Sequence, residues 1–219
     1  MAGSNSCNVL KLVGRAYVLR RKSPGRNAMN FIRHIARAAV LAGLLVPAAA
    51  FAAETVSLPR FDSVGLEGGG HVTVKYGPQQ RVTLLKGSTQ YTRLRVENGH
   101  SLNIEACNDR CPHQYDLEIE IVTPVLEGAA ISGGGEIVAS GNFPHVESFS
   151  AAVNGGGDID VRAVSAKEAH AAVSGGGGIH LTATATLNAA VSGGGEIVYS
   201  GNPQVSEAVN GGGSVERAR

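Results

Sequence analysis

The chain has no tryptophan, and aromatic residues make up only 5% of its 219 residues. Any hydrophobic core must therefore consist of Val, Ile, Leu and Ala. No segment has the 3.6-residue hydrophobic period of an amphipathic helix, and no apolar run after residue 53 is long enough to span a membrane. The sequence also lacks a nucleotide-binding loop, a Ser-His-Asp series and a basic–aromatic pattern for nucleic acid. These absences argue against most enzyme classes and against nucleic acid as a partner.

Residues 29–53 have the pattern of a secretory signal peptide. A short basic region precedes an apolar core at 38–46, and Ala50-Phe51-Ala52 fits a signal-peptidase site. Residues 1–28 are basic and have no apolar core, so we interpret them as an over-extended leader and Met29 as the initiator. The sequence therefore predicts export to the periplasm or the cell surface, without a transmembrane segment in the mature chain.

The basic residues are concentrated in this leader. The whole chain has a net charge of +1, but eight of its 19 Lys and Arg, and none of its 18 Asp and Glu, lie in residues 1–53. Residues 54–219 therefore carry 11 basic and 18 acidic residues, a net charge of −7. This charge argues against nucleic acid or an anionic membrane surface as partner. The length of residues 54–219 predicts a single domain, with ordinary strands in 54–127 and repeats in 128–219.

One phrase occurs five times in the second half of the chain. Ala-Ala-Ile-Ser-Gly-Gly-Gly begins at Ala129, and close variants begin at Ala151, Ala171, Ala189 and Glu207. Successive glycine triplets are separated by 22, 20, 18 and 18 residues. These intervals are too short for helical repeats or propeller blades but suit one coil of stacked β-structure. We therefore predict an all-β fold with a single-stranded β-helix or β-solenoid over 128–219.

The glycine triplets are predicted to form the corners of the coils, because glycine adopts positive φ values at little cost. In the stack, the β-branched residue of each phrase should join an apolar column and the following Ser or Asn a polar column, while the Ala pairs keep the interior narrow. The triplets are Gly133, Gly134, Gly135; Gly155, Gly156, Gly157; Gly175, Gly176, Gly177; Gly193, Gly194, Gly195; and Gly211, Gly212, Gly213. The apolar column is Ile131, Val153, Val173, Val191 and Val209, and the polar column is Ser132, Asn154, Ser174, Ser192 and Asn210.

Residues 54–127 are predicted to contribute antiparallel strands to the same domain. Alternating apolar and polar residues indicate strands at 61–66, 71–76, 81–86, 93–97, 101–106 and 116–122. Asn98-Gly99, between two of these segments, predicts a tight hairpin turn. An isolated glycine triplet, Gly68–Gly70, lies far upstream of the five repeats.

The order of these motifs resembles a known bacterial family. Phe61-Asp62-Ser63-Val64 precedes the isolated triplet, His71-Val72-Thr73-Val74 follows it, and Leu94–Gly99 leads on to Val-Ser/Asn-Gly-Gly-Gly-x-Ile repeats. This order closely resembles the putative auto-transporter adhesin head GIN domain, from about Phe61 to the C-terminus. The resemblance implies a β-helix-like fold and an adhesive function.

Two cysteines lie close together in Cys107-Asn-Asp-Arg-Cys111-Pro-His113. In an exported protein a local disulfide between Cys107 and Cys111 is the leading interpretation, because the compartment is oxidising. Metal binding by Cys107, Cys111 and His113 is the alternative, although zinc sites usually require a fourth ligand. No cofactor is expected.

Acidic residues follow three of the triplets, at Glu136, Asp158 and Glu196. Stacked coils would align them in an acidic stripe, which could bind calcium or catalyse sugar cleavage. The simpler interpretation is a solvated face that discourages pairing of sheet edges.

The sequence thus favours an exported, non-enzymatic interaction module that binds a glycan, an envelope polymer or a protein. Two alternatives are a carbohydrate-active β-helix enzyme and an envelope scaffold or accessory protein. The exposed solenoid ends predict either self-association into a homo-oligomer or an edge blocked by the charges of Glu216, Arg217 and Arg219.

Overall fold

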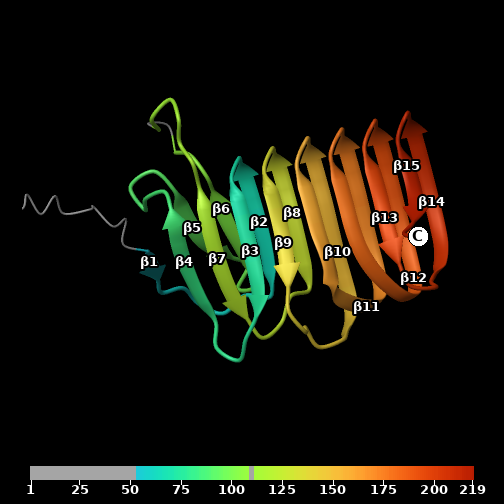
Figure 1. Ribbon diagram of the computed structural model, residues 1–219, viewed down its shortest axis with the longest axis horizontal. Helices are drawn as coiled ribbons and strands as arrows, with labels where there is room; N and C mark the ends of the chain where they lie inside the picture. Colours follow the sequence, from blue (N-terminus) through green and yellow to red (C-terminus); the bar gives the residue numbers. More distant parts are fainter. Residues whose placement is uncertain (1–52, 109–110) are drawn as a thin grey trace, which may run out of the picture. The chain divides into compact units, whose positions relative to one another are not determined.

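The computed structural model describes residues 53–108 and 111–219, which belong to the compact unit Ala48–Arg219. The predicted leader, 1–28, and nearly all of the predicted signal peptide, 29–53, lie outside the described residues. The described part is all-β (Figure 1), and it contains no helix long and apolar enough to cross a membrane. The strands are β1 Glu54–Val56, β2 Ser63–Gly68, β3 His71–Tyr76, β4 Arg81–Lys86, β5 Arg93–Glu97, β6 Ser101–Glu105, β7 Glu118–Thr123, β8 Gly128–Gly133, β9 Glu136–Ser140, β10 Val146–Gly155, β11 Asp158–Gly175, β12 Gly178–Gly193, β13 Glu196–Ser200, β14 Gln204–Gly211 and β15 Ser214–Arg217.

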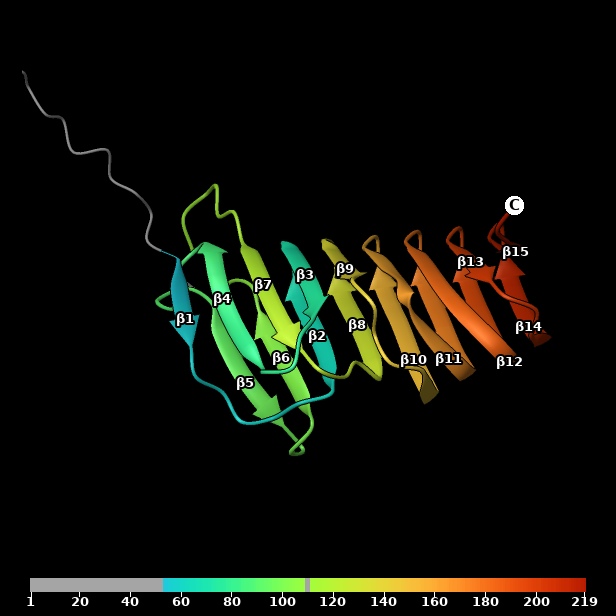
Figure 2. The same cartoon turned by 60° about the horizontal axis from the view of Figure 1, so that its bottom comes forward.

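These strands form one sheet of 15 strands that curls over on itself. Its order is β1-β4-β7-β3-β9-β11-β10-β8-β2-β6-β5, and β12 to β15 continue from β11. Two rows of strands therefore face each other, one through β3 and β9 and the other through β2 and β8 (Figure 2). The long strands β11 and β12 take part in both rows. The buried side chains form a single hydrophobic core, which consists mostly of the expected Val, Ile, Leu and Ala but also contains Phe61, Phe143 and Phe149.

The predicted single-stranded β-helix or β-solenoid is wrong. The sheet is of mixed orientation, with β1–β4, β4–β7 and β5–β6 antiparallel and the other described pairs parallel. The predicted antiparallel arrangement of the N-terminal part is also wrong in part. Strand β2 pairs in parallel with β6 and β8, and β3 pairs in parallel with β7 and β9.

Turn residues explain the strand lengths and one of the antiparallel pairs. Strand β11 runs for 18 residues because no glycine or proline interrupts it between Asp158 and Gly175. Gly141 and Pro144, by contrast, separate β9 from β10. At the other end, Asn98 and Gly99 have φ of 53° and 75° and join β5 to β6 as the predicted hairpin.

The register of the repeats agrees with the prediction. Val153 is aligned with Ile131 and Val173, and Val173 with Val191, which is aligned with Val209. The Ser and Asn column is continuous in the same way. The predicted limits of β3, β4 and β5 are also those of the structure.

The glycine triplets connect successive strands and stack on one another. Gly155 has a φ of 128°, and a Cβ built on it would lie 2.3 Å from the carbonyl oxygen of Gly133. The next amide, that of Gly156, donates a hydrogen bond of 3.0 Å to the same oxygen. The upstream triplet joins this stack, because Gly134 N–H donates to the Gly68 carbonyl at 2.8 Å. Backbone therefore packs on backbone where a side chain would not fit.

Candidate functional site

The five repeated phrases share one continuous outer surface. Side chains alternate between the two faces of a strand, so the two Ala of each pair point in opposite directions. Ala171 is buried in the core, whereas Ala172 is exposed on the outer face, and the other pairs follow the same pattern in β8, β10 and β12. The prediction that both Ala of each pair line the interior is therefore wrong for the second one. The exposed alanines are Ala130, Ala152, Ala172, Ala190 and Ala208.

These alanines form the floor of a groove that runs across the strands, which we call the alanine groove. It has a volume of about 770 Å³ along the Ser and Asn column and extends by about 420 Å³ on the opposite flank. That second flank includes Ser150, His170 and Asn188. Because the strands are in register, the same pattern of a methyl group between two polar groups recurs at the strand spacing of about 4.8 Å.

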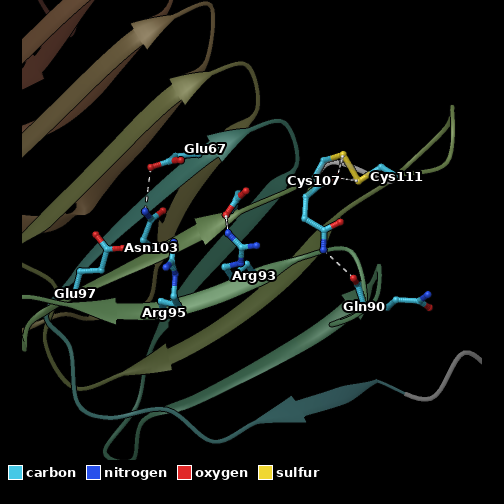
Figure 3. Close-up of polar contacts among 10 residues, drawn as sticks. Glu67, Gln90, Arg93, Arg95, Glu97, Asn103, Cys107 and Cys111 are labelled. Carbon is cyan, nitrogen blue, oxygen red and sulfur yellow. Dashed lines mark hydrogen bonds and ion pairs between the residues drawn. A yellow bond between two sulfur atoms is a disulfide. The ribbon is translucent and has the colours of Figure 1, made fainter.

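One end of the alanine groove is charged (Figure 3). Asn103 on β6 donates a hydrogen bond of 3.0 Å from Nδ2 to Oε1 of Glu67 on β2. Both residues line the groove, as does Glu97 on β5, which lies 3.8 Å from the guanidinium of Arg95. Arg93, farther along β5, is paired with Glu105 at 2.8 Å. Among the described residues, the carboxylates that line the groove are thus confined to this end, on β2 and β5.

The cysteine pair follows β6, outside the groove. Cys107 and Cys111 form a disulfide, with their Cα atoms 5.8 Å apart. Asn108, between them, donates from Nδ2 to the carbonyl of Gln90 at 2.8 Å, which ties the loop to the segment before β5 (Figure 3). Neither cysteine lines the alanine groove.

The three acidic residues of the predicted stripe lie on the row of strands that contains β3 and β9, away from the alanine groove. Glu136, Asp158 and Glu196 occupy equivalent positions on β9, β11 and β13, with Gly178 of β12 between the last two. Glu136 is paired with Nδ1 of His71 at 2.9 Å. Within 53–108 and 111–219, no group of three His, Cys, Asp or Glu side chains is arranged to hold a metal ion.

Asp160, two residues after Asp158, accepts a 2.9 Å hydrogen bond from Nε of Arg162. This contact is the main cause of the lowered pKa of Asp160. A lowered pKa means that the pair stabilises the fold above the unfolded-state pKa of Asp, about 3.9, and that this stability is lost as the pH falls through the folded-state pKa. We expect Asp160→Asn to destabilise the protein by less than about 1 kcal/mol at pH 7, since Arg162 is exposed to solvent and Asp160 is only partly buried. Urea denaturation from pH 7 to pH 2 should show this difference shrinking to zero.

Sequence reasoning missed the alanine groove, although its signal was present. Two adjacent Ala in a strand cannot both face the core, so a repeated Ala-Ala pair implies a column of methyl groups on the outside. The sequence-derived acidic stripe and the cysteine pair are not part of this surface.

Comparison with known proteins supports the resemblance found in the sequence. Residues 129–203 match the family described as putative auto-transporter adhesin, head GIN domain, so the predicted resemblance is confirmed over this segment. A comparison with curated proteins found no match.

The crystal structures that are similar to the chain include three proteins from different bacteria. A putative adhesin from Bacteroides fragilis NCTC 9343 has 16% identity over 76% of this chain and 96% of its own, with a TM-score of 0.49. A putative lipid binding protein from Parabacteroides distasonis ATCC 8503 has 17% identity over 76% and 96%, with a TM-score of 0.31. A putative cell adhesion protein from Clostridium sporogenes ATCC 15579 has 10% identity over 76% and 99%, with a TM-score of 0.32.

Proposed function

We propose, from the match of residues 129–203 to an adhesin head domain, that the protein is an exported, non-enzymatic module that binds a linear, neutral glycan in the alanine groove. The observation that carries this proposal is the repetition of one surface pattern along the groove. Five exposed alanines in register form its floor, with polar residues on both flanks. A polymer of repeating units can make the same contact on each successive strand, so many weak contacts add up to useful affinity.

The chemistry of the groove favours a sugar polymer. Ser hydroxyls and Asn amides both donate and accept hydrogen bonds, which matches the hydroxyl groups of a glycan. The methyl groups of the floor offer an apolar strip for the C–H faces of the sugar rings. Glu67 and Glu97 make one end acidic, and residues 54–219 have a net charge of −7, which together disfavour an anionic polymer.

Other functions fit the groove less well. Energetically dominant residues of protein interfaces are enriched in Trp, Tyr and Arg, and no described residue of these types lines the alanine groove. Glycosidases place two carboxyl groups on either side of the scissile bond. In the described part of the chain, the only carboxyl groups that line the groove are Glu67, which is hydrogen-bonded to Asn103, and Glu97, beside Arg95.

A bulky side chain in the middle of the floor should block binding. We expect Ala172→Phe to weaken glycan binding at least tenfold, because the ring would fill the groove between Ala152 and Ala190 while the exposed position leaves the core unchanged. The parent protein would first be screened on an array of linear polysaccharides. Titration calorimetry with the best ligand would then give the affinity of each variant.

The matched control is Ala185→Phe, which makes the same substitution at an exposed position of β12 that does not line the groove. It should bind like the parent, and both variants should keep the parent's melting temperature. Equal binding by Ala172→Phe and the parent would refute the groove as the site. Cleavage of the polysaccharide that disappears in Glu67→Gln or Glu97→Gln would replace binding with an enzymatic function.

A further inference from the structure

The strands β14 and β15 form an open edge of the sheet. Strand β14 pairs only with β12, and β15 only with β13, among the described residues. The backbone N–H and C=O groups on their other side are therefore available to another strand. The apolar column also ends there without cover: Val209 is 43% exposed, whereas the aligned Val191 is 2% exposed. Such an edge continues the ladder of the repeats and is a template for a second copy of the chain.

One residue at this edge departs from the repeat. Ala129, Ala151, Ala171 and Ala189 occupy the inward position of their phrases and are at most 4% exposed. The aligned residue in β14 is Glu207, which is exposed. Glu207 is thus an acidic residue at a position that points toward the core in every earlier repeat.

We propose that Glu207 prevents the β14–β15 edge from pairing with the same edge of a second copy. Pairing of identical edges about a twofold axis would bring two β14 strands together and cover Val209. It would also enclose the two Glu207 carboxylates at the inner face, where each loses its hydration and neither gains a partner. An inward-pointing charge on an edge strand is one of the devices that keep β-sheet proteins from associating edge to edge. This inference is independent of any function of the alanine groove.

The experiment is to measure self-association of the parent, Glu207→Ala and Glu216→Ala by analytical ultracentrifugation over a range of concentrations. Alanine is the residue of the other four repeats, so Glu207→Ala restores a complete inner face. We expect it to associate at least tenfold more tightly than the parent. Hydrogen exchange should show amides of β14 becoming protected as the concentration rises.

Glu216→Ala is the matched control, because it removes one negative charge from the same edge at an exposed position of β15. It should remain as monomeric as the parent. A folded Glu207→Ala that stays monomeric at the highest concentration would overturn the proposal. So would equal association of the two variants, since net charge rather than the inward position would then protect the edge.

Discussion

Gly155→Ala is expected to destabilise the protein by about 3 kcal/mol or more. The φ of Gly155 is 128°, a value that residues with a side chain rarely adopt. The new Cβ would also lie 2.3 Å from the carbonyl oxygen of Gly133, so the two stacked turns would have to separate. That separation would weaken the hydrogen bond from Gly156 N–H to the same oxygen, which is 3.0 Å long in the native turn.

The neighbouring residue provides a sharp control. A Cβ on Gly156 would have no neighbour within 4 Å, and the φ of this residue lies outside the left-handed region. We therefore expect Gly156→Ala to stabilise the protein by about 0.5 kcal/mol, because alanine restricts the unfolded chain more than glycine does. Urea denaturation of both variants measures the difference. Similar losses of stability in the two would show that the middle glycine has a structural role that its surroundings do not explain.

The repeated glycines predict the local turns of the fold but not its long-range strand pairing. The triplets lie in stacked turns, and the predicted apolar column is aligned and buried from Ile131 through Val153 to Val191. The sequence could not indicate which segments would pair over long distances. Strands β2 and β3 lie far upstream of the repeats, yet they pair with β8 and β9. Such pairings depend on the whole folded sheet rather than on local pattern, so the predictions of a solenoid over 128–219 and of antiparallel strands in 54–127 did not anticipate them.

The position of the groove was missed for a different reason. Each Ala pair, taken as one feature, predicts two small residues that narrow the interior. Alternation along the strand instead gives Ala171 and Ala172 different environments, one 3% exposed in the core and the other on the groove floor. The role of a residue in a strand thus depends on which face of the strand its side chain occupies as much as on its chemical type.

The different environments of Ala171 and Ala172 predict very different effects of a glutamate on stability. Ala171→Glu is expected to cost about 4 kcal/mol or more, because it buries a carboxylate between Ala151 and Ala189 with no cation to pair with it. Ala172→Glu, one residue along, should change stability by less than about 0.5 kcal/mol, since its side chain extends into solvent from the groove floor.

Urea denaturation of both variants at pH 7 and pH 4 tests this expectation. Burial raises the pKa of an acid, so the folded Ala171→Glu variant takes up a proton more readily than its unfolded chain. Its deficit in stability should therefore shrink on acidification, whereas Ala172→Glu should show no such change. If the two variants are equally stable at pH 7, the first Ala of the pair cannot lie in the core. A glutamate is tolerated at the equivalent position of β14, Glu207, because this position lies at an open edge of the sheet. The carboxylate of Glu207 therefore stays hydrated.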